Sequence, residues 1–338
     1  MKHILETLKA ELEKGKKAVL CTVIDNSGSC PRGKGAHMLV SEQSKTIGTV
    51  GGGRVEYETE IKAKELLKTK ENFIQDYRLC PNEVADIGMI CGGNVTILFQ
   101  YMDQSAIDFC DRALALINKH EDAWIVARIS SDFKWEMGFY TPEDGFEGID
   151  GGEEFKPLLM RKAKQNKNKD GSRLYAEPVS LAGQVYLFGG GHVAQAVAPL
   201  LHSVGFRYTL YEEREQFASP DLFPDAERII LGGFDQIEKE IHITENDFVL
   251  IMTRGHQNDY ILQVQVLKTP ACYVGVIGSQ AKYKRLCERL AEDGFSQQEI
   301  DRVITPVGLP IKAETPAEIA VSIVAQMIQV RAERFNEK

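Results

Sequence analysis

The chain has no apolar run long enough to cross a membrane. Its longest uninterrupted runs, such as Phe248–Met252, fall far below the roughly 18 apolar residues that a membrane-spanning helix needs. The N-terminal residues mix glutamate and lysine with apolar positions, and they lack the continuous apolar core of a secretory signal. We therefore expect a cytoplasmic protein with no membrane partner, whose N-terminal residues form a surface helix.

A surplus of positive charge is also lacking. The 40 lysines and arginines are outnumbered by 49 aspartates and glutamates, which gives a formal net charge of -9 at pH 7. General affinity for nucleic acids comes largely from Lys and Arg side chains that neutralise phosphates, so we expect no nucleic-acid partner. Any anionic ligand must be bound locally.

Cysteine pairs of the usual kinds are absent. The seven cysteines include no C-x-x-C pair and have no zinc-type spacing with histidine. We therefore expect reduced thiols, most of them buried as small apolar side chains, and no firm metal site.

The first half of the chain predicts an α+β domain. Length and composition (338 residues, 43% hydrophobic, 26% charged) are typical of a soluble protein with two domains. Over residues 1–104, short β-rich runs alternate with glycine-rich turns, and residues 55–67 favour a helix. Residues 105–180 follow with a helix, two strands and a polar linker. We expect the six basic residues of 161–173 to lie in a solvated loop of that linker.

The second half, residues 181–338, predicts a Rossmann-like doubly wound parallel sheet. Short apolar strands alternate with helical segments from residue 184 onward. The predicted strands are 185–188, 208–211, 228–231, 248–252 and 273–277. In the last helix, Thr315 and Glu318 have the spacing of a capping box.

One turn of this second half has the pattern of a dinucleotide site. Gly189, Gly191 and Ala194 fit G-x-G-x-x-[G/A] between a strand and a helix, and Glu212 ends the next predicted strand. Glycines allow backbone N–H groups to approach a pyrophosphate at the helix N-terminus, and Glu212 would accept a ribose hydroxyl. Two interpretations stay open: the domain binds NAD or another nucleotide, or it keeps the turn for packing or for a different ligand.

Two further loops follow predicted strands at the edge where open α/β sheets bind ligands. Arg254, in the loop 253–259, would supply positive charge, and Ser279 would cap the helix that follows it. His256 is a candidate proton donor. The alternative is that His256 and Asp259 only hold their loop in place.

The first half contains a second candidate anion site. Gly51, Gly52 and Gly53 directly precede a predicted helix, so their N–H groups and the positive helix end would attract an anion. Arg32 and Lys34 lie in another glycine-rich loop and would reach the same ligand. A simple β-turn scaffold explains three successive glycines poorly.

Taken together, these segments resemble the XdhC/CoxI family of accessory proteins for molybdenum-containing hydroxylases, notably xanthine dehydrogenase. The motifs that carry the likeness are G-S-x-P-R-x-x-G-A-x-M-L-V at 28–40, G-T-V-G-G-G-x-V-E at 48–56, C-G-G at 91–93, F-G-G-G-H-V-A-Q-A at 188–196, T-R-G-H-x-x-D at 253–259, G-S at 278 and G-L-P-I-K-A-E-T-P-A-E-I-A-V-S-I at 308–323. Few other families carry both the first three and the remaining four.

The resemblance implies a chaperone of purine catabolism that transiently binds the molybdenum cofactor, a pterin with a phosphate and a dithiolene. It implies sulfuration of that cofactor through a cysteine desulfurase, and insertion into xanthine dehydrogenase or a related hydroxylase. Cys91 is the candidate thiol for contact with the cofactor's molybdenum, while Arg54 stands where some relatives carry cysteine. The chain lacks the C-x₄-C-x₂-C spacing of iron–sulfur clusters, so it does not resemble the hydroxylase itself.

Two other functions remain as alternatives. An NAD(P)-dependent oxidoreductase would use the Rossmann turn, with His256 as proton donor. A pure interaction protein would dock through the basic segment 161–173. We expect a homodimer on general grounds, because symmetric dimers are the commonest soluble oligomers.

Overall fold

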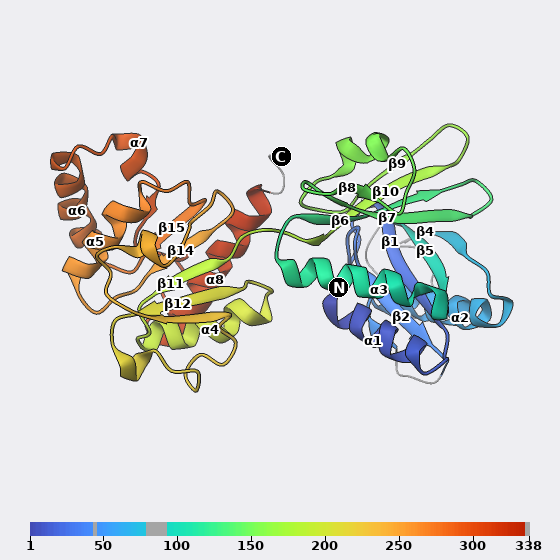
Figure 1. The fold of residues 1–338 in the computed structure, drawn as a ribbon, viewed down its shortest axis with the longest axis horizontal. Coiled ribbons are helices and arrows are strands. Elements are labelled where there is room, and N and C mark those ends of the chain that lie inside the picture. Colours follow the sequence, from blue (N-terminus) through green and yellow to red (C-terminus); the bar gives the residue numbers. More distant parts are fainter. Residues whose placement is uncertain (43–45, 79–92, 335–338) are drawn as a thin grey trace. The chain divides into compact units, whose positions relative to one another are not determined.

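The computed structural model describes residues 1–42, 46–78 and 93–334, except for the side chains of residues 280–283. The chain divides between Leu181 and Ala182 into two compact units. Figure 1 labels most of the helices and strands of both. No helix within these ranges is long and apolar enough to span a membrane.

The first unit contains two antiparallel five-stranded sheets, A and B. Sheet A has the order β3-β2-β1-β5-β4 and sheet B the order β8-β7-β6-β10-β9. The strands of sheet A are β1 (Ala18–Gly28), β2 (His37–Ser41), β3 (Ile47–Gly48), β4 (Phe73–Arg78) and β5 (Gly93–Met102). The strands of sheet B are β6 (Ala123–Ile129), β7 (Trp135–Thr141), β8 (Gly145–Glu147), β9 (Lys164–Lys167) and β10 (Arg173–Ser180). The helices are α1 (Lys2–Glu13), α2 (Gly53–Thr69) and α3 (Ile107–Lys119), with short 3₁₀ turns η1 (Gln104–Ala106) and η2 (Gly152–Leu158).

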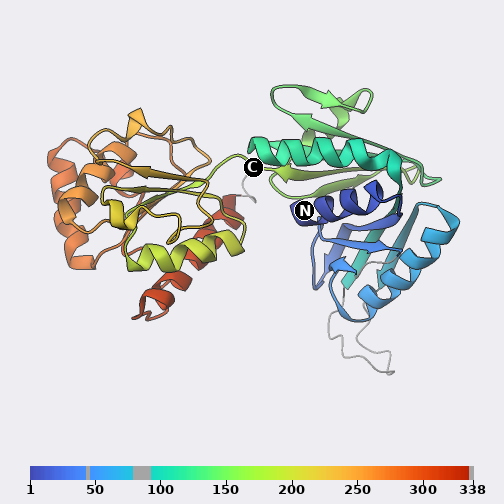
Figure 2. The same cartoon turned by 60° about the horizontal axis from the view of Figure 1, so that its bottom comes forward.

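Strand β1 is covered on both faces, which explains its continuous apolar sequence. Successive strand residues point to opposite faces of a sheet. Val19, Cys21 and Val23 therefore pack in the core that includes α2, and Ala18 and Leu20 pack in the core that includes α1 and α3. Figures 1 and 2 both show α1 and α3 side by side.

One hydrophobic core joins the two sheets of the first unit. Helix α1 contributes Leu5 and Leu8, sheet A contributes Leu20, and sheet B contributes Ile125 and Phe139. Residues from before and after residue 105 thus share buried contacts. The division into residues 1–104, 105–180 and 181–338 stays a prediction.

The prediction that residues 161–173 form a solvated loop is wrong in part. Residues 164–167 form strand β9, which pairs antiparallel with β10. Strand β10 lies between β6 and β9, and its Leu174, Tyr175 and Ala176 are buried. The lysines of β9 stand at the sheet edge, where charged side chains prevent pairing with other chains. The polar composition of this segment suggested a loop. It forms a hairpin because β9 pairs with the buried strand β10.

The second unit is a six-stranded parallel sheet of the predicted Rossmann-like class. Its strand order is β13-β12-β11-β14-β15-β16. The strands are β11 (Val185–Phe188), β12 (Tyr208–Glu212), β13 (Arg228–Leu231), β14 (Phe248–Ile251), β15 (Tyr273–Val276) and β16 (Val303–Ile304). The five predicted strands are confirmed, whereas the two-residue strand β16 has no pattern in the sequence that would predict it.

Helices cover both faces of this sheet. They are α4 (His192–Ser203), α5 (His256–Val266), α6 (Gln280–Glu292), α7 (Gln297–Ile300) and α8 (Pro316–Arg334), with 3₁₀ turns η3 (Glu215–Phe217) and η4 (Ile237–Lys239). Residues of α4 and α8 pack with Leu187 and Leu250 on one face, and residues of α5 and α6 pack with Phe188 and Ile251 on the other. The predicted capping box of α8 is confirmed, because Thr315 and Glu318 exchange side-chain to backbone hydrogen bonds.

The strand order creates a topological switch point. The chain runs outward from β11 through β12 to β13 and then returns to the other side of β11 to form β14. The loops after β11 and β14 therefore diverge at the carboxyl edge of the sheet, where open α/β sheets bind ligands.

Because the sheet is packed on both faces, shortening a side chain of a central strand should lower the free energy of unfolding strongly. Leu250 on β14 is fully buried, so Leu250→Ala should lower the free energy of unfolding by about 2–5 kcal/mol. Leu231 ends the edge strand β13 with 54% of its surface exposed, so Leu231→Ala should change it by less than about 0.5 kcal/mol. Urea denaturation followed by circular dichroism measures both, and equal effects would contradict this account of the core.

Candidate functional site

The glycine-rich segments of the first unit meet in space. A Cβ on Gly51 would lie 3.3 Å from Cβ of Pro31, and a Cβ on Gly93 would lie 2.7 Å from Sγ of Cys30. The loop 27–36, the turn 48–53 and the start of β5 thus form one cluster, here called the signature-loop cluster. The candidate thiol Cys91 lies outside the described residues.

Two side chains of the motif hold the triple-glycine turn. Gly51 N–H donates to Oγ1 of Thr49 at 3.1 Å, and Gly52 N–H donates to Oε2 of Glu56 at 3.0 Å. The Thr49 hydroxyl donates to the same Glu56 oxygen. All three glycines, Gly51, Gly52 and Gly53, have positive φ. Two of the N–H groups expected to bind an anion are therefore satisfied within the chain, and the space beside Gly52 is open.

The two cations of the loop differ in their availability. Lys34 forms an ion pair with Asp25, with 2.7 Å between Nζ and Oδ1, and Asp25 also accepts a hydrogen bond from Gln165 of β9. Arg32 is exposed and has no hydrogen bond or ion pair with another described residue. Arg32 is thus the cation that this loop leaves available to a ligand.

A buried polar network that the sequence analysis missed supports the cluster. Nε2 of His37 lies 2.8 Å from Oε2 of Glu177, and its Nδ1 lies 3.1 Å from Oγ1 of Thr22. The Tyr175 hydroxyl donates to the same Glu177 oxygen at 2.9 Å, and burial raises the pKa of Tyr175 well above its usual value. The main-chain carbonyl of His37 accepts the N–H of Thr49 at 2.9 Å. The only signal in the sequence is a glutamate within the otherwise apolar stretch of β10.

The glycine turn of the second unit fits its motif position by position. Gly189 has φ +97°, and a Cβ there would lie 2.5 Å from the carbonyl oxygen of Met252, so the turn and the end of β14 approach too closely for a side chain. Gly191 is the N-cap residue of α4, and the space beside it is open. Ala194 is fully buried against the sheet. The turn is therefore built for close packing at one end and for open space at the helix N-terminus.

Glu212 is the most enclosed charged group of this edge, with 1% of its surface exposed. Its Oε2 accepts the N–H of Gly190 at 2.6 Å, and its two oxygens accept bonds of 2.8 and 2.9 Å from the guanidinium of Arg214 and one of 2.9 Å from the N–H of Arg214. Burial alone would raise the pKa of Glu212, but the bonds from Arg214 and Gly190 outweigh it, so the pKa lies below its ordinary value.

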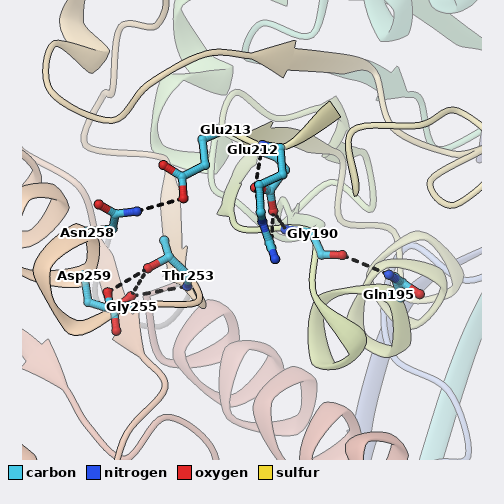
Figure 3. A network of polar contacts seen from close by, with 9 residues as sticks. Gly190, Gln195, Glu212, Glu213, Thr253, Gly255, Asn258 and Asp259 are labelled. Carbon is cyan, nitrogen blue, oxygen red and sulfur yellow. Dashed lines mark hydrogen bonds and ion pairs between the residues drawn. The ribbon is translucent and has the colours of Figure 1, made fainter. Parts of the chain in front are cut away.

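Further hydrogen bonds fix the loops around the turn. Figure 3 shows Gly190 between Glu212 and Gln195, whose side-chain amide donates to the Gly190 carbonyl at 2.9 Å. It also shows Asn258 of α5 donating to Glu213, at 2.9 Å.

The loop after β14 is held by Asp259. Oδ1 of Asp259 accepts hydrogen bonds from the N–H and the hydroxyl of Thr253, at 3.2 and 2.6 Å. Arg254 and His256 are exposed and have no partner among the described residues. Asp259 therefore does hold the loop, as the alternative interpretation proposed, whereas His256 does not.

The prediction that the Ser279 side chain caps the following helix is wrong. Ser279 is the N-cap residue of α6, but its side chain makes no capping hydrogen bond and is exposed. Its hydroxyl is therefore not committed to the helix that it precedes.

The thiols and metal ligands of the described residues add no further site. Cys21 and Cys110 are buried, and burial raises the pKa of the Cys110 thiol to about 11, which keeps it protonated and unreactive. No group of three or more His, Cys, Asp or Glu side chains in this part of the chain could hold a metal ion. Among these thiols, Cys30 is the one at the signature-loop cluster, where it donates to the carbonyls of Ser27 and Asn94 at 3.3 Å.

Replacing the Glu212 carboxylate should lower the free energy of unfolding by an amount that depends on pH. Glu212→Gln removes the negative charge and one of the two oxygens that the Arg214 guanidinium contacts, and it should lower the free energy of unfolding by about 1.5–3 kcal/mol at neutral pH. Because the folded-state pKa is below the unfolded one, the carboxylate stabilises fully above the unfolded value of about 4.3, and this stabilisation is lost as pH falls through the folded value.

The difference between wild type and Glu212→Gln in urea unfolding should therefore shrink on acidification. Glu213→Gln is the matched control, because Glu213 is exposed and a glutamine oxygen still accepts from Asn258. A deficit that stays constant down to low pH would show that the Glu212 charge does not matter.

The two outer glycines of the turn should respond differently to alanine. Gly189→Ala places a Cβ against the Met252 carbonyl at a positive φ, so it should lower the free energy of unfolding by about 2 kcal/mol or more. Gly191→Ala has room and φ −66°, so its free energy of unfolding should stay within about 1 kcal/mol of wild type. Thermal unfolding of both variants measures the contrast, and similar melting temperatures would refute it.

Comparison with known proteins agrees with the architecture of both units. The model of the XdhC and CoxI family matches residues 11–78, and the model of the XdhC Rossmann domain matches residues 185–327. A protein of Bacillus subtilis described as a probable component of xanthine dehydrogenase is 26% identical over 96% of each chain, and the molybdenum cofactor insertion chaperone PaoD of Escherichia coli is 24% identical over 97% of this chain and 88% of its own. A crystal structure described as a xanthine dehydrogenase from Bacillus halodurans superposes with a TM-score of 0.83 at 25% identity, over 98% of this chain and 96% of the other. This chain belongs to the XdhC and CoxI family.

Proposed function

We propose that this protein is an accessory factor that binds the molybdenum cofactor as cargo and inserts it into xanthine dehydrogenase or a related molybdenum hydroxylase. Support comes from the names of the two relatives, one of which refers to xanthine dehydrogenase and the other to cofactor insertion. The observation that carries the proposal is Arg32, which has no partner among the described residues and whose backbone nitrogen would lie 3.8 Å from a Cβ on Gly51, one residue before the open space at Gly52.

The chemistry of the cluster suits an anionic cargo. Molybdopterin carries a phosphate, and a guanidinium binds phosphate oxygens through two parallel hydrogen bonds. The net charge of -9 gives the molecule little general attraction for anions. A single uncommitted arginine beside a prebuilt glycine turn therefore binds the phosphate locally, and the small number of contacts permits release.

The second unit offers a similar set of groups. Gly191 leaves open space at the N-terminus of α4, and the exposed side chains of Arg254 and Ser279 have no hydrogen-bond partner in the part of the chain that the structure describes. We propose that Arg254 binds an anionic part of the cargo, assisted by the Ser279 hydroxyl. His256 then serves as a hydrogen-bond donor at the same edge of the sheet.

Sulfuration completes the proposal. Cys91 is the candidate thiol, and a cysteine desulfurase is the candidate sulfur donor. The buried Cys21 and Cys110 are unsuited to this chemistry, because a buried thiol gives little thiolate. The protein then acts in the cytoplasm, as a homodimer, and meets the apo-hydroxylase after loading.

Charge reversal tests the proposed anion contacts. Arg32→Glu and Arg254→Glu should each lower retention of molybdopterin during gel filtration roughly tenfold or more, because each loses a charge-assisted hydrogen bond and gains repulsion. Lys134→Glu and Arg228→Glu are the controls, since both side chains are exposed and bind carboxylates of the chain. Unchanged retention in both test variants, with folding intact, would refute the placement of the cargo.

A further inference from the structure

The glycine turn after β11 has the pattern of a turn that binds a nicotinamide dinucleotide. In that mode the acidic residue that ends the second strand accepts hydrogen bonds from the adenosine ribose, and a nearby arginine accommodates the 2′-phosphate of NADP. Glu212 and Arg214 stand at those two places. Both modes require side-chain atoms that are free to meet the ligand.

The Glu212 carboxylate has no free acceptor position. An ionised carboxylate has about four lone-pair sites. Oε1 accepts from the N–H and the Nε–H of Arg214, both at 2.9 Å, and Oε2 accepts from Gly190 N–H at 2.6 Å and from Arg214 at 2.8 Å. A ribose hydroxyl would have to displace one of these charge-assisted or buried bonds.

Arg214 is equally committed. Its guanidinium bonds to Glu212 through two nitrogens and stacks on the ring of Phe217, with 4.1 Å from Cζ to the ring centroid. A 2′-phosphate would therefore compete with a carboxylate that already lies on the guanidinium, and it would be repelled by that carboxylate.

The 3₁₀ turn η3 restricts the same place sterically. A Cβ on Gly190 would collide with the carbonyl oxygen of Phe217, so the turn after β12 lies directly against the glycine turn. The direct bond between Gly190 and Glu212 leaves no room for a sugar between them. Gly190 is thus required because the chain itself fills the place next to it.

We infer that Arg214 is a specificity-determining residue that keeps Glu212 from binding a ribose, so that this Rossmann unit excludes NAD and NADP. Glu212 acts as a positioning residue that fixes the peptide of Gly190, with Gln195 holding the other side of that peptide. The glycine turn and the open space at Gly191 remain, so the unit retains a place for a ligand without a ribose contact. This inference is independent of the proposed cargo.

Titration of the full-length protein with NADH and NADPH tests the inference. Wild type should show no saturable binding of either by calorimetry. Arg214→Met frees two acceptor positions of Glu212 and should raise the affinity for NADH roughly tenfold or more, while NADPH should gain less because the uncompensated carboxylate repels its 2′-phosphate. The double variant Arg214→Met with Glu212→Gln should lose the gain, which a merely structural role of Arg214 would not produce.

Two controls keep the test decisive. Arg207→Met breaks a different ion pair of the same unit, with Glu227 at 2.8 Å, and should leave nucleotide binding unchanged. Arg214→Lys keeps the charge but loses the two-pronged contact, and it replaces the methionine variant if that one fails to fold. Ordinary micromolar binding of NADH by wild type that is lost in Glu212→Gln would overturn the inference, as would a folded Arg214 variant without any gain.

Discussion

The backbone N–H groups of the glycine-rich turns need hydrogen-bond acceptors, and in both units a glutamate of the chain supplies one. Glu56 accepts from Gly52, and Glu212 accepts from Gly190. A buried N–H group without an acceptor is costly. Part of the N–H set of each turn is therefore satisfied without a ligand, which is why the glycine motifs cannot be equated with open anion sites.

N–H groups that are already bonded within the chain attract an anion less strongly, so the cations beside the glycines matter more for binding. The turns are preformed, so binding to them costs little ordering of the chain. In the proposed function, Arg32 and Arg254 supply the charge that the anionic cargo meets, because neither side chain has a partner among the described residues. If the protein acts as the carrier proposed above, a rigid turn with one available cation suits release of the cargo better than a site in which every N–H group binds the ligand.

The sequence predicted what local patterns determine. Short apolar runs indicated the strands β11 and β13 with their observed bounds, and the capping box indicated the start of α8. The hairpin β9–β10 was missed, because β9 is polar and forms only through pairing with its buried neighbour. The fingerprint of the Rossmann turn fixed residue types and spacing, but the competition of Arg214 for Glu212 is a matter of side-chain geometry, which spacing does not specify.

The support of the signature-loop cluster was beyond prediction for a different reason. His37 and Glu177 are 140 positions apart, and their contact depends on how sheet A packs on sheet B. Through His37, this contact continues to Thr49, and through Thr49 to Glu56 and the triple-glycine turn. Asp25 adds a second link to sheet B. It forms an ion pair with Lys34 and accepts a hydrogen bond from Gln165 of β9. Hydrogen bonds from the strands of sheet B thus fix the loops of sheet A, and Arg32 is the cation of these loops that has no partner within the described part of the chain.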